Sequence, residues 1–81
     1  MTMKDWLLQV IEAAHRDAVY TGSFEDWNVR VRCWDETHVY VEAFSDLDQD
    51  SAFQKRVRTV DPGAAADEII VLMKIGVVHG S

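Results

Sequence analysis

The apolar residues of this chain change their spacing at Trp27, and that change restricts the fold more than any other feature of the sequence. Up to residue 20 they recur every three or four positions, the period of an amphipathic helix. In residues 27–34 and again in residues 38–44, apolar and polar residues alternate, the period of a half-buried strand. Both periods in separate blocks predict an α+β domain.

The N-terminal segment predicts a helix with one buried stripe. Thr2 followed by Asp5 has the spacing of a capping box. The apolar positions at helical spacing are Met3, Trp6, Leu7, Val10, Ile11, Ala14 and Ala18. Gly22, just past Tyr20, is placed to end this helix through a left-handed C-terminal cap.

The two alternating segments predict a hairpin, and its register follows from the faces that must meet. A two-residue loop at 35–36 would pair apolar with polar residues. A three-residue loop at 35–37 keeps one face apolar, so we expect that register. Its apolar pairs are Cys33 with Val39, Val31 with Val41 and Val29 with Ala43. Its pairs on the other face are Trp34 with His38, Arg32 with Tyr40 and Arg30 with Glu42, giving an aromatic pair, a cation–π contact and an ion pair.

The C-terminal part predicts one more strand and one more helix. Residues 52–60 favour an edge strand, where Lys55 discourages unwanted pairing. Asp61 followed by Pro62 is typical of a helix start. The stripe of this helix is Ala66, Ile69, Ile70, Met73 and Val77, with Gly76 near its end. The expected fold is a single α+β domain over residues 1–81, ordered α-β-β-β-α, with a three-stranded antiparallel sheet packed against two helices.

The charge of the chain narrows its partners. A net charge of −6 argues against generic binding to nucleic acid or to an anionic membrane, and favours a basic protein partner. No stretch approaches the length of apolar sequence that spans a membrane. The single Cys33 forms no internal disulfide and no signal peptide is evident, so we expect a cytoplasmic protein.

The stretch Ser45 to Ser51 (SDLDQDS) has the start of a calcium loop. Asp46, Asp48 and Asp50 occupy the first, third and fifth positions of an EF-hand pattern. The sixth position is Ser51 instead of glycine and the twelfth is Val57 instead of glutamate. A solvated acidic turn between two strands is therefore the expected structure, with no bound metal.

Basic and aromatic residues alternate on the polar face of the predicted sheet. They are Arg30, Arg32, Arg56 and Arg58 with Trp34, His38 and Tyr40. Such a face can bind single-stranded nucleic acid by stacking and phosphate contacts. The surrounding acids would repel a phosphate chain, so we favour a protein interface, a homodimer among the alternatives.

Residues that would support catalysis or hold a cofactor are not grouped in the sequence. His15, His38 and His79 are scattered, Cys33 falls on the apolar face, and zinc-ligand spacing is absent. The glycine after Pro62 could indicate a phosphate site, but the carboxylate at Asp61 favours simple helix initiation. The sequence predicts a non-enzymatic binding protein without a cofactor.

The predicted element order resembles the double-stranded RNA-binding fold and, in part, HicB-type antitoxins. The RNA-binding family opens its last helix with a lysine-rich segment, whereas residues 61–68 here read DPGAAADE. If the fold is shared, the resemblance implies that this RNA-binding function is lost or replaced.

The segment Asp61 to Ala66 (DPGAAA) carries a second resemblance. It is similar to the helix start that follows three antiparallel strands in a type I-F inhibitor, one of the small phage-encoded anti-CRISPR proteins. Small size, acidity and a lack of grouped catalytic residues are also similar to that group. The resemblance covers a minor part of the chain. It implies binding to a CRISPR surveillance complex or its nuclease, in the host cytoplasm, and a block of DNA recognition or nuclease recruitment.

An acidic protein can also occupy a basic nucleic-acid channel as a phosphate mimic. We therefore expect an inhibitor that binds a nucleic-acid-handling complex such as a Cas effector. The residues expected at the interface are Asp35, Glu36, Asp46, Asp48 and Asp50 as polar contacts, Trp34 and Tyr40 as anchors, and Arg30, Arg32, Arg56 and Arg58 on the sheet. The alternatives are an RNA- or DNA-binding or antitoxin-like module that uses the arginine and aromatic face, and a homodimeric regulatory protein.

Overall fold

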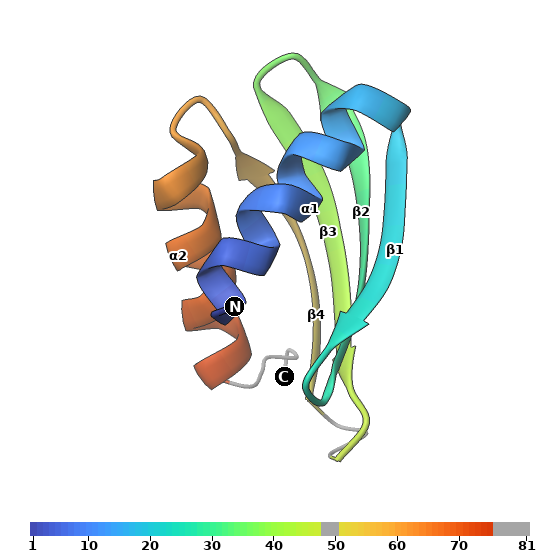
Figure 1. The fold of residues 1–81 in the computed structure, drawn as a ribbon, viewed down its shortest axis with the longest axis vertical. Coiled ribbons are helices and arrows are strands. Elements are labelled where there is room, and N and C mark those ends of the chain that lie inside the picture. Colours follow the sequence, from blue (N-terminus) through green and yellow to red (C-terminus); the bar gives the residue numbers. More distant parts are fainter. Residues whose placement is uncertain (48–50, 76–81) are drawn as a thin grey trace.

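The computed structural model describes residues 1–47 and 51–75 of the chain. Its elements are α1 (Met3–Asp17), β1 (Val19–Phe24), β2 (Trp27–Asp35), β3 (His38–Ser45), β4 (Ala52–Arg58) and α2 (Pro62–Ile75). The strands form one antiparallel sheet in the order β1-β2-β3-β4, so each strand pairs with its neighbour in sequence. The molecule is an α+β domain with the two helices packed on one side of a four-stranded sheet (Figure 1).

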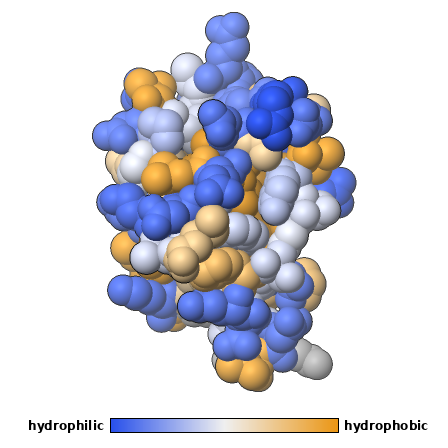
Figure 2. All heavy atoms as spheres, viewed as in Figure 1, coloured by the Kyte–Doolittle hydropathy of each residue, from blue (hydrophilic) through white to orange (hydrophobic). Residues whose placement is uncertain are grey.

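The core lies between the helices and one face of the sheet. Alternate residues of the central strands, such as Val31 and Val41, are fully buried there. The α1 stripe contributes Trp6, Leu7, Val10, Ile11 and Ala14, and α2 contributes Ala65, Ala66, Ile69 and Met73. Seen from the side of Figure 1, the exposed surface mixes hydrophilic and apolar side chains (Figure 2). Neither helix in the described part of the chain could cross a membrane.

The sequence prediction missed one strand. Residues 19–24 form β1, which pairs with β2 from Val19 opposite Arg32 to Phe24 opposite Trp27. The expected helix end at Gly22 is therefore wrong, because α1 stops at Asp17 and Ala18 turns the chain at φ 76°. The expected order α-β-β-β-α becomes α-β-β-β-β-α. The resemblance to the double-stranded RNA-binding fold was drawn from an order with one strand too few.

The expected hairpin register between β2 and β3 is confirmed on the apolar face. Cys33 lies opposite Val39, Val31 opposite Val41, and Val29 opposite Ala43. On the other face, Arg32 lies opposite Tyr40 and Arg30 opposite Glu42, as expected. The expected pairing of Trp34 with His38 is wrong, because the register shifts between Cys33 and Asp35 and brings Asp35 opposite His38.

Both helix starts follow the sequence prediction. The hydroxyl of Thr2 accepts a hydrogen bond from the backbone N–H of Asp5 at 3.1 Å, and the Asp5 carboxylate returns toward the Thr2 N–H, forming the capping box. In α2 the Asp61 carboxylate accepts from the N–H of Ala64 at 3.2 Å. The edge strand β4 ends at Arg58 instead of Val60. The expected stripe residue Val77 and the glycine before it lie outside the described residues.

Candidate protein-binding face

One surface of the sheet is left uncovered by the described elements. We call it the outer face, and define it as the strand residues whose side chains point away from the helices. They are Val19, Thr21, Ser23, Asn28, Arg30, Arg32, Trp34, His38, Tyr40, Glu42, Phe44, Ala52, Gln54, Arg56 and Arg58. Because both helices pack on the opposite surface, no described helix covers the outer face.

Four outer-face side chains form an arginine and aromatic cluster, comprising Arg32, Trp34, Tyr40 and Arg56. The guanidinium carbon of Arg32 lies 5.4 Å from the centre of the Tyr40 ring. Tyr40 and Trp34 are 6.0 Å apart between ring centres, and Arg56 lies 5.4 Å from the centre of Trp34. The contacts therefore run from Arg32 through the adjacent rings of Tyr40 and Trp34 to Arg56, across three strands. Both are residue types that carry much of the binding energy at protein interfaces.

The position of this cluster depends on local backbone geometry. The register shift after Cys33 places Trp34 where its indole contacts Tyr40 and Arg56 instead of His38. The Tyr40 hydroxyl donates a hydrogen bond to the Gln54 amide oxygen at 2.9 Å, which fixes its ring. Trp34 is still 55% exposed, so it can act as an anchor for a partner.

Glu42 is the carboxylate at the centre of the outer face. Its Oε1 atom lies 3.8 Å from the Arg32 guanidinium, so the expected partner, Arg30, is replaced by the arginine one step along the same face. That oxygen is shielded from solvent and accepts no hydrogen bond from any residue that the structure describes. Leaving a shielded carboxylate oxygen without a hydrogen bond has a free-energy cost.

A shallow groove runs across the lower half of the outer face. Its volume is about 610 Å³, and it crosses all four strands. The outer-face side chains that line it are Thr21, Ser23, Asn28, Arg30, Glu42, Phe44, Ala52 and Gln54. Phe44 is 54% exposed and provides the large apolar surface of the groove. Phe44 and Gln54 were not among the interface residues predicted from the sequence, although the alternation of the strands places both on this face.

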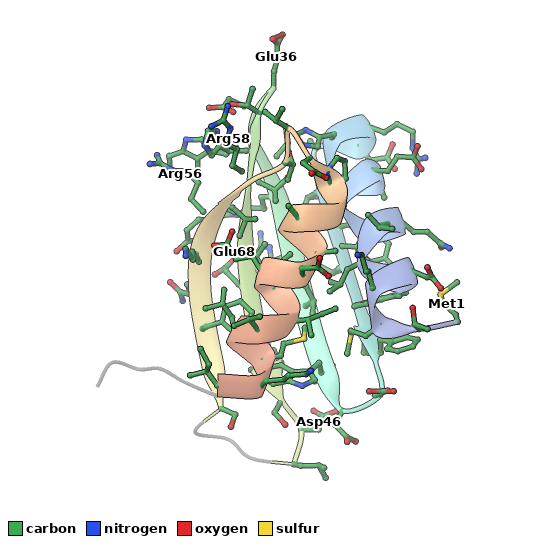
Figure 3. The ribbon with its side chains drawn as sticks, turned by 90° about the vertical axis from the view of Figure 1, so that its left-hand side faces the viewer. Met1, Glu36, Asp46, Arg56, Arg58 and Glu68 are labelled. Atoms are coloured by element: carbon green, nitrogen blue, oxygen red, sulfur yellow. The ribbon has the colours of Figure 1, made fainter. Side chains whose placement is uncertain are left out.

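The charges of the chain are divided between the outer face and its surroundings. Among the described residues, Glu42 is the one carboxylate on the outer face, which also carries Arg30, Arg32, Arg56 and Arg58. In Figure 3, Arg56 and Arg58 project from β4 on the side away from the helices. The outer face is therefore basic although the chain as a whole has a net charge of −6.

The acidic residues expected at the interface do not form one patch. Asp35 and Glu36 lie at the β2–β3 turn, whereas Asp46 follows β3 at the opposite end of the sheet (Figure 3). Asp48 and Asp50 lie outside the described residues. The outer face separates the two acidic ends, so the described acids could contact only widely separated parts of a partner.

Asp35 and Asp46 are also engaged within the molecule. The Asp35 carboxylate accepts from the Thr37 backbone N–H at 2.8 Å and the Thr37 hydroxyl at 3.0 Å, and lies 3.2 Å from the His38 ring. The backbone hydrogen bond from Thr37 is the main reason that the pKa of Asp35 is lowered. Asp46 accepts from the Asn28 amide at 2.6 Å. The Asp35 carboxylate therefore orders its own turn, whereas that of Asp46 joins the end of β3 to the start of β2.

A group of polar side chains near the top of α1 was not expected from the sequence. His15 Nε2 lies 2.7 Å from the Thr59 hydroxyl, and His15 Nδ1 lies 3.5 Å from the Cys33 sulfur. A cavity of about 460 Å³ opens beside His15 and Thr59. The sequence prediction treated the histidines as scattered, because these three residues are far apart in the chain. Cys33 is half-buried beneath the sheet, as its position on the apolar face indicated.

Metal-binding groups and relatives were both sought for the chain. Within residues 1–47 and 51–75, no three His, Cys, Asp or Glu side chains are close enough to hold a metal ion. Comparison of the chain with protein-family models, curated proteins and solved structures finds no match.

Proposed function

We propose that this protein is a non-catalytic inhibitor that binds a CRISPR–Cas effector through the outer face and blocks nucleic-acid recognition or cleavage. The observation that supports binding most directly is the uncovered sheet surface with its arginine and aromatic cluster. Trp, Tyr and Arg side chains beside a groove that contains an exposed Phe are typical of a protein interface. The host cytoplasm is where such an inhibitor would act.

The choice of partner rests on charge and on the resemblance at Asp61 to Ala66. A net charge of −6 favours association with the basic surfaces of a complex that holds nucleic acid. Glu36 projects at one end of the sheet and Asp46 lies at the other, so these carboxylates would contact lysines or arginines of the effector. The outer-face arginines would then pair with acidic residues of the same partner.

Inhibition tests the proposal directly. A purified type I surveillance complex is mixed with labelled target DNA, with and without this protein, and DNA binding and cleavage are measured. We expect binding or cleavage to fall as the protein is added. Trp34→Ala should weaken inhibition by at least tenfold, as for an interface anchor. Full DNA binding and full cleavage at saturating protein would contradict the proposed function.

A matched set of charge variants locates the surface. Arg32→Ala and Arg56→Ala each remove one positive charge from the outer face, and Lys74→Ala removes one from α2 on the other side of the molecule. We expect the first two to weaken inhibition and the third to leave it unchanged. Asp46→Asn and Glu36→Gln test the acidic ends, and should weaken binding and its dependence on salt.

Binding to single-stranded nucleic acid is a second candidate function, favoured by the two adjacent rings of Tyr40 and Trp34 between Arg32 and Arg56. Bases could stack on the rings while the guanidinium groups contact phosphates. Gel-shift assays with single-stranded DNA and RNA at low and moderate salt would test it, because phosphate binding falls steeply with salt. No shift at low salt would remove this candidate.

A further inference from the structure

The strand β1 forms an edge of the sheet without the usual features that prevent edge pairing. Its sequence, VYTGSF, contains neither a charged residue nor a proline, and its pairing with β2 is continuous. The opposite edge, β4, carries Lys55, Arg56 and Arg58. Proteins commonly use such charges to keep an edge strand from pairing with another chain. Pairing with a strand of another chain is therefore less hindered at β1 than at β4.

The backbone groups of β1 that have no partner within residues 1–47 and 51–75 can be assigned from one hydrogen bond. The N–H of Cys33 donates to the carbonyl of Ala18 at 2.8 Å, so the backbone of Ala18 faces β2. Successive residues of a strand direct their N–H and C=O groups to opposite sides. Tyr20 and Gly22 therefore also face β2. Val19, Thr21 and Ser23 present their N–H and C=O groups at the free edge.

These outward groups match a second copy of the same strand. In an antiparallel pair, residues directly opposite each other point to the same face of the sheet. With a two-fold axis at Thr21, each Thr21 lies opposite its copy and Val19 lies opposite Ser23 of the second copy. All the outward N–H and C=O groups of β1 are then paired. Tyr20 lies opposite Gly22 of the second copy, and the space above each Gly22 is filled by the Tyr20 ring of its own chain.

The charges around β1 favour the same arrangement. Arg16 precedes the start of the strand and Arg32 lies opposite Val19, whereas Glu25 and Asp26 form the turn at its end. A two-fold antiparallel pair places the start of one strand beside the end of the other. The acidic turn of each copy then lies near the start of β1 of the other, where Arg16 already pairs with Asp17 at 3.1 Å and Arg32 lies 3.8 Å from Glu42. No like charges lie directly opposite each other within β1.

We propose that β1 pairs with β1 of a second copy about a two-fold axis at Thr21, which makes the protein a homodimer with one continuous sheet. Both outer faces lie on the same side of that sheet, so the arginine and aromatic clusters are presented together. The pairing uses the edge of the sheet and leaves the outer face open. It is therefore independent of the partner proposed above.

Sedimentation of the full-length chain over a dilution series, from millimolar to low micromolar, tests the dimer. We expect the wild type to dimerise reversibly. Thr21→Lys places two positive charges directly opposite each other, so it should be monomeric at concentrations where the wild type is a dimer. Ala52→Lys adds the same charge to the opposite edge strand and should dimerise like the wild type. A monomeric wild type throughout, or equal dimerisation of the two lysine variants, would overturn the proposal.

Two further variants separate pairing from misfolding and fix the axis. Thr21→Pro removes the outward N–H, a change that an edge strand tolerates, and should yield a folded monomer by circular dichroism. In a Cys33→Ala background, a short bis-maleimide reagent should join Thr21→Cys chains far more readily than Ser23→Cys chains. Equal or stronger cross-linking at position 23 would overturn the axis at Thr21. Because Thr21 also lines the groove of the outer face, inhibition by the wild type is compared at concentrations above and below its dimerisation midpoint, and this separates the dimer from the proposed function.

Discussion

The guanidinium group of Arg56 lies over the indole of Trp34, 5.4 Å from the ring centre. An arginine of the edge strand β4 thus covers an aromatic side chain of β2, with β3 lying between the two strands. A cation over an aromatic ring at an exposed site contributes about 0.5–1 kcal/mol. We expect a double-mutant cycle of Arg56→Ala and Trp34→Ala, measured by urea denaturation, to give a coupling free energy of about this size.

The control for this cycle pairs Trp34→Ala with Arg58→Ala. Arg58 lies on the same strand and face as Arg56 but opposite His38. Its coupling to Trp34 should be smaller than that of Arg56. Equal coupling for both arginines would mean that general charge effects, instead of the contact with the ring, determine the measured value.

The hydrogen bond between His15 and Thr59 should support the contact between α1 and the chain after β4. Thr59 is buried, and its hydroxyl lies 2.7 Å from His15 Nε2. We expect Thr59→Val to lower the free energy of unfolding by about 1–3 kcal/mol, because a shielded polar group loses its partner. Thr59→Ser retains the hydroxyl and should lose less. A smaller loss for valine than for serine would contradict a structural role for this bond.

Asp61 should act as the N-cap of α2. Its carboxylate accepts from the Ala64 N–H, and its carbonyl accepts from the Ala65 N–H at 3.0 Å. Asp61→Ala removes the side-chain acceptor and should cost about 0.5–2 kcal/mol of stability in thermal or urea unfolding. Asp61→Asn keeps an acceptor and should lie close to the wild type. If Asp61→Asn lowers stability as much as Asp61→Ala does, the capping hydrogen bond is not the source of the effect.

Asp35 should make the stability of the protein depend on pH in the acid range. Its pKa is lowered from the ordinary value of 3.8, chiefly by the Thr37 backbone hydrogen bond. A lowered pKa in the folded state means that the ionised carboxylate stabilises the fold above the ordinary value. This contribution is lost as the pH falls through the lowered value.

Unfolding measured at a series of pH values, from neutral to well below 3.8, tests this expectation. Asp35→Asn should lower stability at neutral pH and reduce the loss of stability on acidification. Glu36→Gln changes the neighbouring carboxylate without altering the bonds from Thr37 and His38, and serves as the control. If the free energy of unfolding falls equally with acidification in the Asp35→Asn variant and the wild type, the hydrogen bonds at this turn do not couple to folding.

The parts of the fold that the sequence predicted are those where burial determines the pattern. The register of β2 and β3 followed from keeping Val29, Val31 and Cys33 on one face, and β4 was recognised as an edge strand from its basic residues. The same alternation placed Arg32 beside Tyr40. Much of the outer face could thus be predicted, because alternate residues of paired strands lie on the same side of a sheet independently of the loop conformations.

The parts that were missed have no such pattern. Ala18 continues the helical stripe in sequence, yet it adopts a positive φ and begins the turn into β1, a conformation for which alanine gives no signal. The shift that moves Trp34 away from His38 depends on how the turn at Asp35 closes. The approach of His15 to Cys33 and Thr59 joins segments 18 and 44 residues apart, and only the assembled fold brings them together.

The order of the sheet has a consequence for how the chain folds. Because β1, β2, β3 and β4 pair in sequence order, each pairing closes only a short loop, and such local contacts favour rapid formation. The contact between the helices is different, since Lys4 of α1 meets Asp67 of α2 across 63 residues. Among the described elements, docking of α1 on α2 therefore closes the longest loop. In native-state hydrogen exchange we expect the helix amides to open at lower free energy than those of the central strands β2 and β3.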